Sequence, residues 1–214
     1  CLLSRGLGDV YKRQIISKSS LCSGGAEQVE RTYYSNNTIP DKESLTTSQR
    51  SAIQLLTSRN YLTTPVQQTM EKKDKRLYSV LRGYSSSLSS GMVVEDQYYC
   101  KGTDKYEKRI SYNKYDIYGN PVYINKDGAE KVVYLWGYKG QYLLAEIKGA
   151  TYEEVKKALM VDPASMSSCI LPSIPLYLNM IDNLYKALPS ALITSYTYHP
   201  LIGVSGIILS LIHI

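Results

Sequence analysis

The chain has 214 residues, a formal net charge of +6, 21 tyrosines, one tryptophan and no phenylalanine. It has only two histidines and four cysteines, which form no metal-binding or catalytic motif. The composition therefore predicts no cofactor, no metal site and no enzymatic activity.

The two ends share an origin that sets them apart from the rest of the chain. Residues Asp9 to Gln14 can be encoded by GATGTGTATAAGAGACAG, and the reverse complement of that DNA translates as the last six residues, Leu209 to Ile214. We therefore interpret residues 1–14 as a non-native leader and 209–214 as a non-native tail, both translated from a sequencing-library transposon end. Without them the net charge falls to +4.

The apolar tail from residue 201 onward does not predict a membrane span. A spanning helix needs roughly 20 apolar residues, whereas the native part, 201–208, contains two glycines. A β-strand with a glycine bend is the better interpretation. The native cysteines, Cys22, Cys100 and Cys169, make no self-contained disulfide framework.

The first elements alternate between polar and periodic segments. Residues 15–44 are polar and predict a linker or irregular surface. Thr46 and Gln49 have capping-box spacing and predict a helix to about Arg59. A hairpin is expected at 64–81 around a charged turn, followed by a loop at Ser85–Ser90 and extended chain at 92–99.

The middle of the chain predicts central strands and two helical segments. Tyr106, Ile110 and Tyr112 are expected to share a strand face, and Asp127 with Gly128 predicts a tight turn. Apolar runs at 132–136 and 142–147 are typical of strands covered on both faces. A second capping box, Thr151 with Glu154, starts a helix to about 160. Residues 161–190 form a proline-punctuated helical insertion, with a helix at 177–188, before a strand at 192–198.

A short motif occurs twice in this middle region. Tyr115, Asp116, Gly119 and Asn120 form the first copy, and Trp136-Gly137-Tyr138-Lys139-Gly140 repeats its shape. The turn glycines lie 21 residues apart, at 119 and 140, which suggests a repeat array. Glycine permits positive φ where the strand reverses, and Asp116 can accept amide hydrogens in the turn.

These residues resemble the YD-repeat, or RHS-repeat, family of large surface-associated or secreted Bacteroidetes proteins. The resemblance covers about 45–159 and 187–204 and is degenerate. Asn120 stands where the family often has arginine, and Gly137 where the second unit should have aspartate. Ser195 to Pro200 resembles the start of a further repeat, although Gly203 lies five residues after Tyr198, whereas Gly119 lies four residues after Tyr115.

The resemblance implies a mainly β fold: an antiparallel YD-repeat-like strand array with two or three short helices. Residues 45–160 would hold a helix and the tyrosine-rich β region, and 191–208 the opening strand of a further repeat. We expect a non-enzymatic structural or interaction segment, located extracellularly or at the cell surface, whose partners are neighbouring repeats of the parent protein. The alternatives are a carbohydrate or cell-surface binding module, and the shell portion of a toxin-delivery protein whose effector is missing.

For individual residues, the sequence supports structural roles more strongly than chemical ones. Glu153 and Glu154 suit the first turn of a helix, and His199 has no acidic or cysteine neighbour in sequence. The basic run at 72–76 suits a solvated turn and does not predict nucleic-acid binding. Exposed aromatic rings could stack on sugars, and the candidates are Trp136, Tyr134, Tyr138 and Tyr142.

Overall fold

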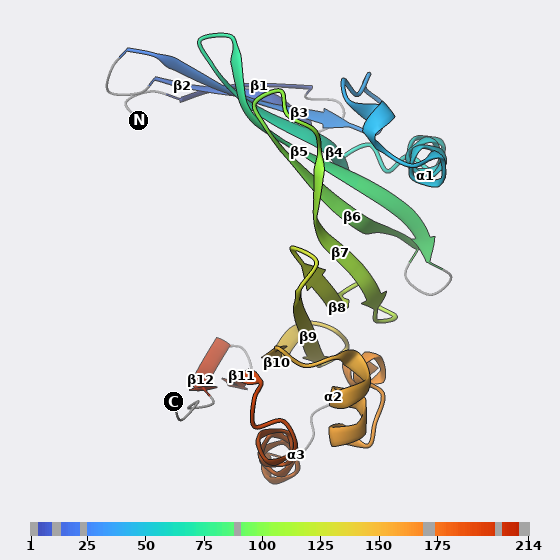
Figure 1. The fold of residues 1–214 in the computed structure, drawn as a ribbon, viewed down its shortest axis with the longest axis vertical. Helices are drawn as coiled ribbons and strands as arrows, with labels where there is room; N and C mark the ends of the chain where they lie inside the picture. The colour runs from blue at the N-terminus through green and yellow to red at the C-terminus, as the bar shows by residue number, and fades with distance from the viewer. Residues whose placement is uncertain are drawn as a thin grey trace. The chain divides into compact units, whose positions relative to one another are not determined.

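The computed structural model describes residues 4–9, 14–21, 25–87, 91–168, 174–199 and 203–209. It is mainly β, with an antiparallel open sheet and a few short helices, which confirms the expected class. Strands that follow one another along the chain are neighbours in the sheet. The chain forms two compact units, residues 1–87 with 92–109, and 88–91 with 110–214 (Figure 1).

Among the described residues, the first unit contains six strands and one α-helix, which are drawn in blue and green in Figure 1. The strands are β1 (Ser4–Asp9), β2 (Gln14–Leu21), β3 (Glu27–Tyr34), β4 (Pro65–Lys72), β5 (Lys75–Ser87) and β6 (Gly91–Lys101). The helix α1 (Thr47–Ser58) follows a short 3-10 turn, η1 (Lys42–Ser44), and begins at the predicted capping box of Thr46 and Gln49. Lys73 and Asp74 adopt positive φ in the β4–β5 turn, so the predicted hairpin is confirmed.

The core of the first unit lies between α1 and the sheet. Its buried apolar residues are Ile39, Leu45, Ala52, Ile53, Leu56, Val66, Leu81 and Tyr84. Gln49 is also buried and reaches over Gly83 of β5, where a Cβ atom would lie 2.3 Å from the glutamine side chain. Glycine at position 83 therefore lets the helix place a polar side chain directly on the strand.

The second unit carries the predicted repeat motifs. Its strands are β7 (Glu107–Tyr115), β8 (Pro121–Lys126), β9 (Glu130–Gly137), β10 (Tyr142–Lys148), β11 (Leu192–His199) and β12 (Gly203–Leu209). The part of β7 that belongs to this unit begins at Ile110. Between β10 and β11 the chain forms α2 (Tyr152–Leu159), η2 (Pro163–Ser168) and α3 (Ile174–Ala187). The capping box of Thr151 and Glu154 is present, as predicted.

The core of the second unit is formed by β9, β10 and β11 with α2, η2 and α3. All its members are apolar: Val133, Leu135, Leu144, Ala145, Ile147, Ala150, Val155, Met166, Ile181, Leu184, Ala191 and Ile193. Val132 is buried on the other face of β9. Burial on both faces explains the continuous apolar run in β9.

Several sequence-based boundaries differ from the structure. Residues 15–44 were expected to be irregular, but they form most of β2 and all of β3. Most side chains of β3 are half-buried although several of them are polar, among them Gln28, Glu30 and Thr32, so strand pairing outweighs the local turn signals. Ser85–Ser87 continue β5 where a loop was expected, while the rest of that loop lies outside the described residues.

Two further boundaries shift in the second half. Tyr106 precedes β7, so only Ile110 and Tyr112 lie in the strand. Helix α3 begins at Ile174, earlier than residue 177. Residues 1–14 and 209–214 contain β1, the first residue of β2 and the last residue of β12. The transposon origin of these two stretches concerns their DNA and stays a prediction.

Candidate functional site

The first turn motif is organised around the Asp116 carboxylate. This side chain is 1% exposed, and its Oδ1 accepts hydrogen bonds from the amides of Tyr118 at 2.9 Å and Asn120 at 2.8 Å. Its Oδ2 accepts from the Asn120 side chain at 3.1 Å. Gly119 has φ +87°, as the motif predicted. Asp116 therefore has the expected turn-capping contacts.

The second turn contacts the first. The Asn120 side chain donates to the Gly140 carbonyl at 2.8 Å, and Gly140 has φ +75°. A Cβ atom at Gly140 would lie 2.6 Å from the Asn120 amide nitrogen and 2.9 Å from Tyr118. The two glycines that defined the 21-residue period thus belong to turns that touch. Gly137 has a different role, since a Cβ atom there would lie 2.7 Å from Leu144.

The four residues predicted to stack on sugars do not form one surface. Tyr134 and Trp136 alternate along β9 with the core residues Val133 and Leu135, so they lie on the opposite face. Tyr138 instead packs against that core. The set is therefore divided between the two faces of the sheet.

Each member of the set has neighbours within the unit. Burial raises the pKa of Tyr134 to about 12, and the nearby Glu146 carboxylate adds to the shift. Tyr138 and Tyr142 lie edge to face with centroids 5.2 Å apart, and the Tyr198 ring lies 4.7 Å from Tyr142. These three rings form a tyrosine cluster that joins the second turn to the end of β11.

A contact that the sequence did not predict recurs in both units. In each of four hairpin-like strand pairs, an aromatic side chain near the end of one strand donates to a backbone carbonyl at the start of the preceding strand. We call this contact an aromatic clasp. The four clasps are Tyr34 to Ile15 at 3.1 Å, Tyr84 to Pro65 at 2.8 Å, Trp136 to Pro121 at 2.8 Å and Tyr198 to Leu143 at 2.7 Å.

The clasps also share one register. The recorded pairings nearest the clasped ends are Ser17 with Arg31, Gln67 with Leu81, Tyr123 with Val133 and Ala145 with Ser195. In every case the acceptor lies two residues before the first member of that pair, and the aromatic donor three residues after the second. The clasp is therefore a structural repeat of strand pairs, independent of the 21-residue sequence period.

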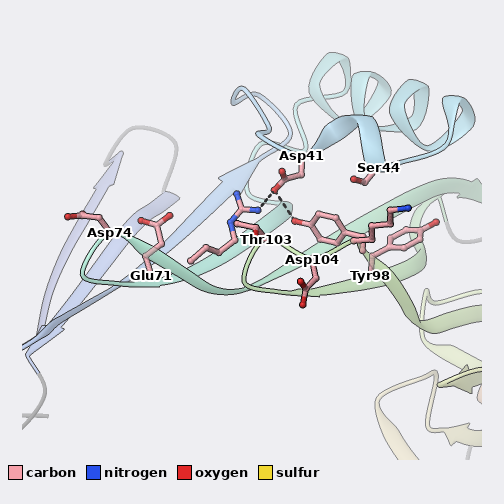
Figure 2. Close-up of a pocket in the computed structure, with 10 residues that line it drawn as sticks. Asp41, Ser44, Glu71, Asp74, Tyr98, Thr103 and Asp104 are labelled. Carbon is pink, nitrogen blue, oxygen red and sulfur yellow. Dashed lines mark hydrogen bonds and ion pairs between the residues drawn. The ribbon is translucent and has the colours of Figure 1, made fainter.

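A polar cleft of about 820 Å³ lies in the first unit (Figure 2). Its lining residues are Asp41, Ser44, Glu71, Asp74, Arg76, Tyr98, Thr103, Asp104, Lys105 and Tyr106. Arg76 forms an ion pair with Asp41 at 2.9 Å, and the Tyr106 hydroxyl donates to the same carboxylate at 2.9 Å. Gln67 donates to Asp41 and to Ser79, the latter at 3.0 Å, from beneath the cleft.

The chemistry of this cleft favours a structural network. Burial raises the pKa of Tyr106 well above its usual range, and the hydrogen bond to Asp41 adds to the effect, so the phenol stays protonated at neutral pH. Burial also raises the pKa of the nearby Cys100 thiol, whose sulfur donates to the Asp104 carbonyl at 2.8 Å. A protonated, buried thiol is a poor nucleophile.

The remaining sequence candidates have local structural contacts. The Glu154 carboxylate accepts from the Thr151 amide at 2.7 Å, and hydrogen bonding to Thr151 lowers its pKa. His199 is exposed at the end of β11. Lys73 and Asp74 form the tip of the β4–β5 hairpin. Cys22 and Cys169 lie outside the described residues.

In comparisons with known proteins, no protein-family model matches the chain, and no curated protein matches it. Within the described parts of the chain, no group of three or more histidine, cysteine, aspartate or glutamate side chains could hold a metal ion. None of the described helices is long and apolar enough to cross a membrane.

Proposed function

We propose that this chain is a non-enzymatic structural or interaction segment of a large, surface-associated or secreted YD-repeat protein. In this role the strand pairs stack on neighbouring repeats and position other parts of the parent protein. The aromatic clasp is the observation that carries the proposal. A contact used four times in one register is what a repeated building unit requires, because each unit must attach to the next in the same way.

The contacts of the motif residues support the same role. Asp116 caps its turn, Asn120 joins that turn to Gly140, and Trp136 fastens β9 to β8. Each of these polar groups has partners inside the chain. Tyrosine and tryptophan suit such positions because they bury a ring while their polar hydrogen reaches an acceptor.

The full-length coding sequence tests the family and the role together. We expect further hairpins with a Tyr-Asp pair and a turn glycine, and an aromatic residue near the end of each second strand. Each aromatic residue should lie just before a turn, at the position that the clasp register defines. A parent sequence with neither feature would overturn the proposal.

Carbohydrate or cell-surface binding is the second candidate, and the tyrosine cluster is the observation that favours it. Tyr138, Tyr142 and Tyr198 bring three half-buried rings together, whereas Trp136 faces the other side of the sheet. A glycan array tests this candidate with Tyr142→Ala and, as the control, Trp136→Ala. Glycan binding lost only in Tyr142→Ala would support it, and the absence of any glycan signal would exclude it.

The shell portion of a toxin-delivery protein is compatible with the same structural role. In that case the effector would be encoded downstream and the clasped strands would form part of its container. A variable C-terminal domain after further repeats, read from the complete gene, would support this version.

A further inference from the structure

β12 presents an unpaired edge within the described part of the sheet. It pairs with β11 on one side and stands last in the strand order. Its side chains are unusually apolar for an exposed strand, with Val204 54%, Ile207 60% and Ile208 42% exposed. An edge of this kind offers backbone hydrogen-bonding groups and apolar surface to another strand.

The clasps indicate what kind of strand fits this edge. Pro65, the acceptor of the Tyr84 clasp, lies opposite Tyr34 in the β3–β4 pairing, and Tyr34 is itself a clasp donor. β4, which contains this acceptor, thus lies between two strands that each carry a clasp donor.

The second unit follows the same rule. Leu143, the acceptor of the Tyr198 clasp, lies opposite the donor Trp136. The acceptor Pro121 likewise lies opposite Tyr115, the tyrosine of the first sequence motif. Three of the four clasp acceptors therefore lie opposite an aromatic residue near the end of the preceding strand. The fourth acceptor, Ile15, lies opposite Gly8 of β1.

Applied to the last donor, the rule selects one residue of β12. Tyr198 lies opposite Val204 in the β11–β12 pairing. We infer that the edge of β12 is a docking surface for an antiparallel strand that ends in tyrosine or tryptophan, and that this aromatic side chain donates to the Val204 carbonyl. By the clasp register, the docking strand pairs with Gly206 and carries its aromatic residue three positions later.

The partner is thus a strand of the kind this chain already contains. β3, β5, β9 and β11 all present such an aromatic, so continuity with the existing strand pairs favours a strand over a helix or a small ligand. The inference rests on the proposed function, because it names the chemistry by which a neighbouring repeat would attach.

A synthetic peptide with the sequence of β9, Glu130–Gly137, tests the inference on the full chain. With its Val133 opposite Gly206, its Trp136 falls at the clasp position. We expect the peptide to slow amide hydrogen exchange across β12. A peptide with Trp136→Phe keeps an aromatic ring but loses the N–H donor and part of the indole surface, so its affinity should fall by at least about fivefold, the value of one hydrogen bond.

A charged edge provides the matched control in the protein. Ile207→Lys should abolish peptide binding, because an exposed lysine discourages strand pairing at an edge, whereas Leu192→Lys, on β11, should not. Equal binding of the two peptides, or exchange protection outside β12, would overturn the inference. The proposed function would fail separately, if ring-preserving changes at the clasps inside the chain left its stability unchanged.

Discussion

The two units fasten their strands in the same way but cover them differently. Each unit has two aromatic clasps in one register. The core of the second unit is built from apolar side chains of the sheet and the helical insertion. The first unit also has an apolar core, but it buries more polar side chains beside it, among them Gln49, Gln67, Thr69, Ser79 and Asp96, than the second unit, where Asp116, Ser167 and Ser195 are buried. The clasp is therefore a property of the strand pair, and it is the same whichever helices cover the strands.

The difference implies that the units depend on different interactions. The apolar core is stabilised by burial and close packing, so lost volume should matter most there. In the first unit the buried amides and hydroxyls need their partners, and an unpaired group costs free energy on its own. Substitutions of each kind should separate the two units.

The largest effect is expected from Leu135→Ala in the second unit. Leu135 is fully buried in the apolar core, and a cavity there should lower the free energy of unfolding by about 2–5 kcal/mol. Chemical denaturation measures this change, with Leu192→Ala on β11 as the partly exposed control. A loss below that of the control would contradict the assignment of this core.

Asp116→Ala should have the next largest effect. The substitution leaves the amides of Tyr118 and Asn120 without their acceptor, at a cost of about 1–3 kcal/mol. Asp116→Asn keeps an acceptor oxygen and should lose less. If both variants were as stable as the native chain, the carboxylate would have no turn-capping role.

Gln67→Ala tests the buried polar network of the first unit. Gln67 contacts Asp41, Ser79 and Tyr106, so its removal should cost about 1–3 kcal/mol by leaving buried groups unpaired. Gln68→Ala, at the next position of β4, provides a half-buried comparison. Gln68 itself accepts a hydrogen bond from Arg82 at 2.9 Å, so a Gln67→Ala variant as stable as the native chain would show that the network does not stabilise this unit.

Sequence patterns predicted the local elements better than the contacts between them. The capping boxes of α1 and α2 and the turn glycines at 119 and 140 were predicted, because their signals lie within a few residues. β2 and β3 were missed because their polar residues show little apolar alternation.

The clasps had no sequence signal of comparable strength. Their acceptors are backbone carbonyls, which any residue supplies, and their donors are either tyrosine or tryptophan. Donor and acceptor are separated by 19, 19, 15 and 55 residues, because helices interrupt the last pair. Only the paired strands reveal the constant register, although a tyrosine or tryptophan near the end of each second strand could be sought once the register is known.

The smallest expected change in the free energy of unfolding occurs only at alkaline pH and concerns the second unit. Burial raises the pKa of Tyr134 to about 12, so between its ordinary value and 12 the folded chain keeps a proton that the unfolded chain loses. Stability should therefore be fully present below about pH 10 and fall as the pH rises toward 12. Denaturation series at several pH values should show a shallower decline in Tyr134→Phe. An unchanged slope would contradict the assigned environment.

The clasp is tested most directly by comparing four tyrosine-to-phenylalanine variants for their free energies of unfolding. Tyr34→Phe, Tyr84→Phe and Tyr198→Phe each remove one donor to a strand-start carbonyl and keep the ring. Each should lose about 1 kcal/mol. Tyr61 is 50% exposed and lies outside the clasps, so Tyr61→Phe should be neutral. If all four variants were equally stable, the clasps would not hold the strand pairs together.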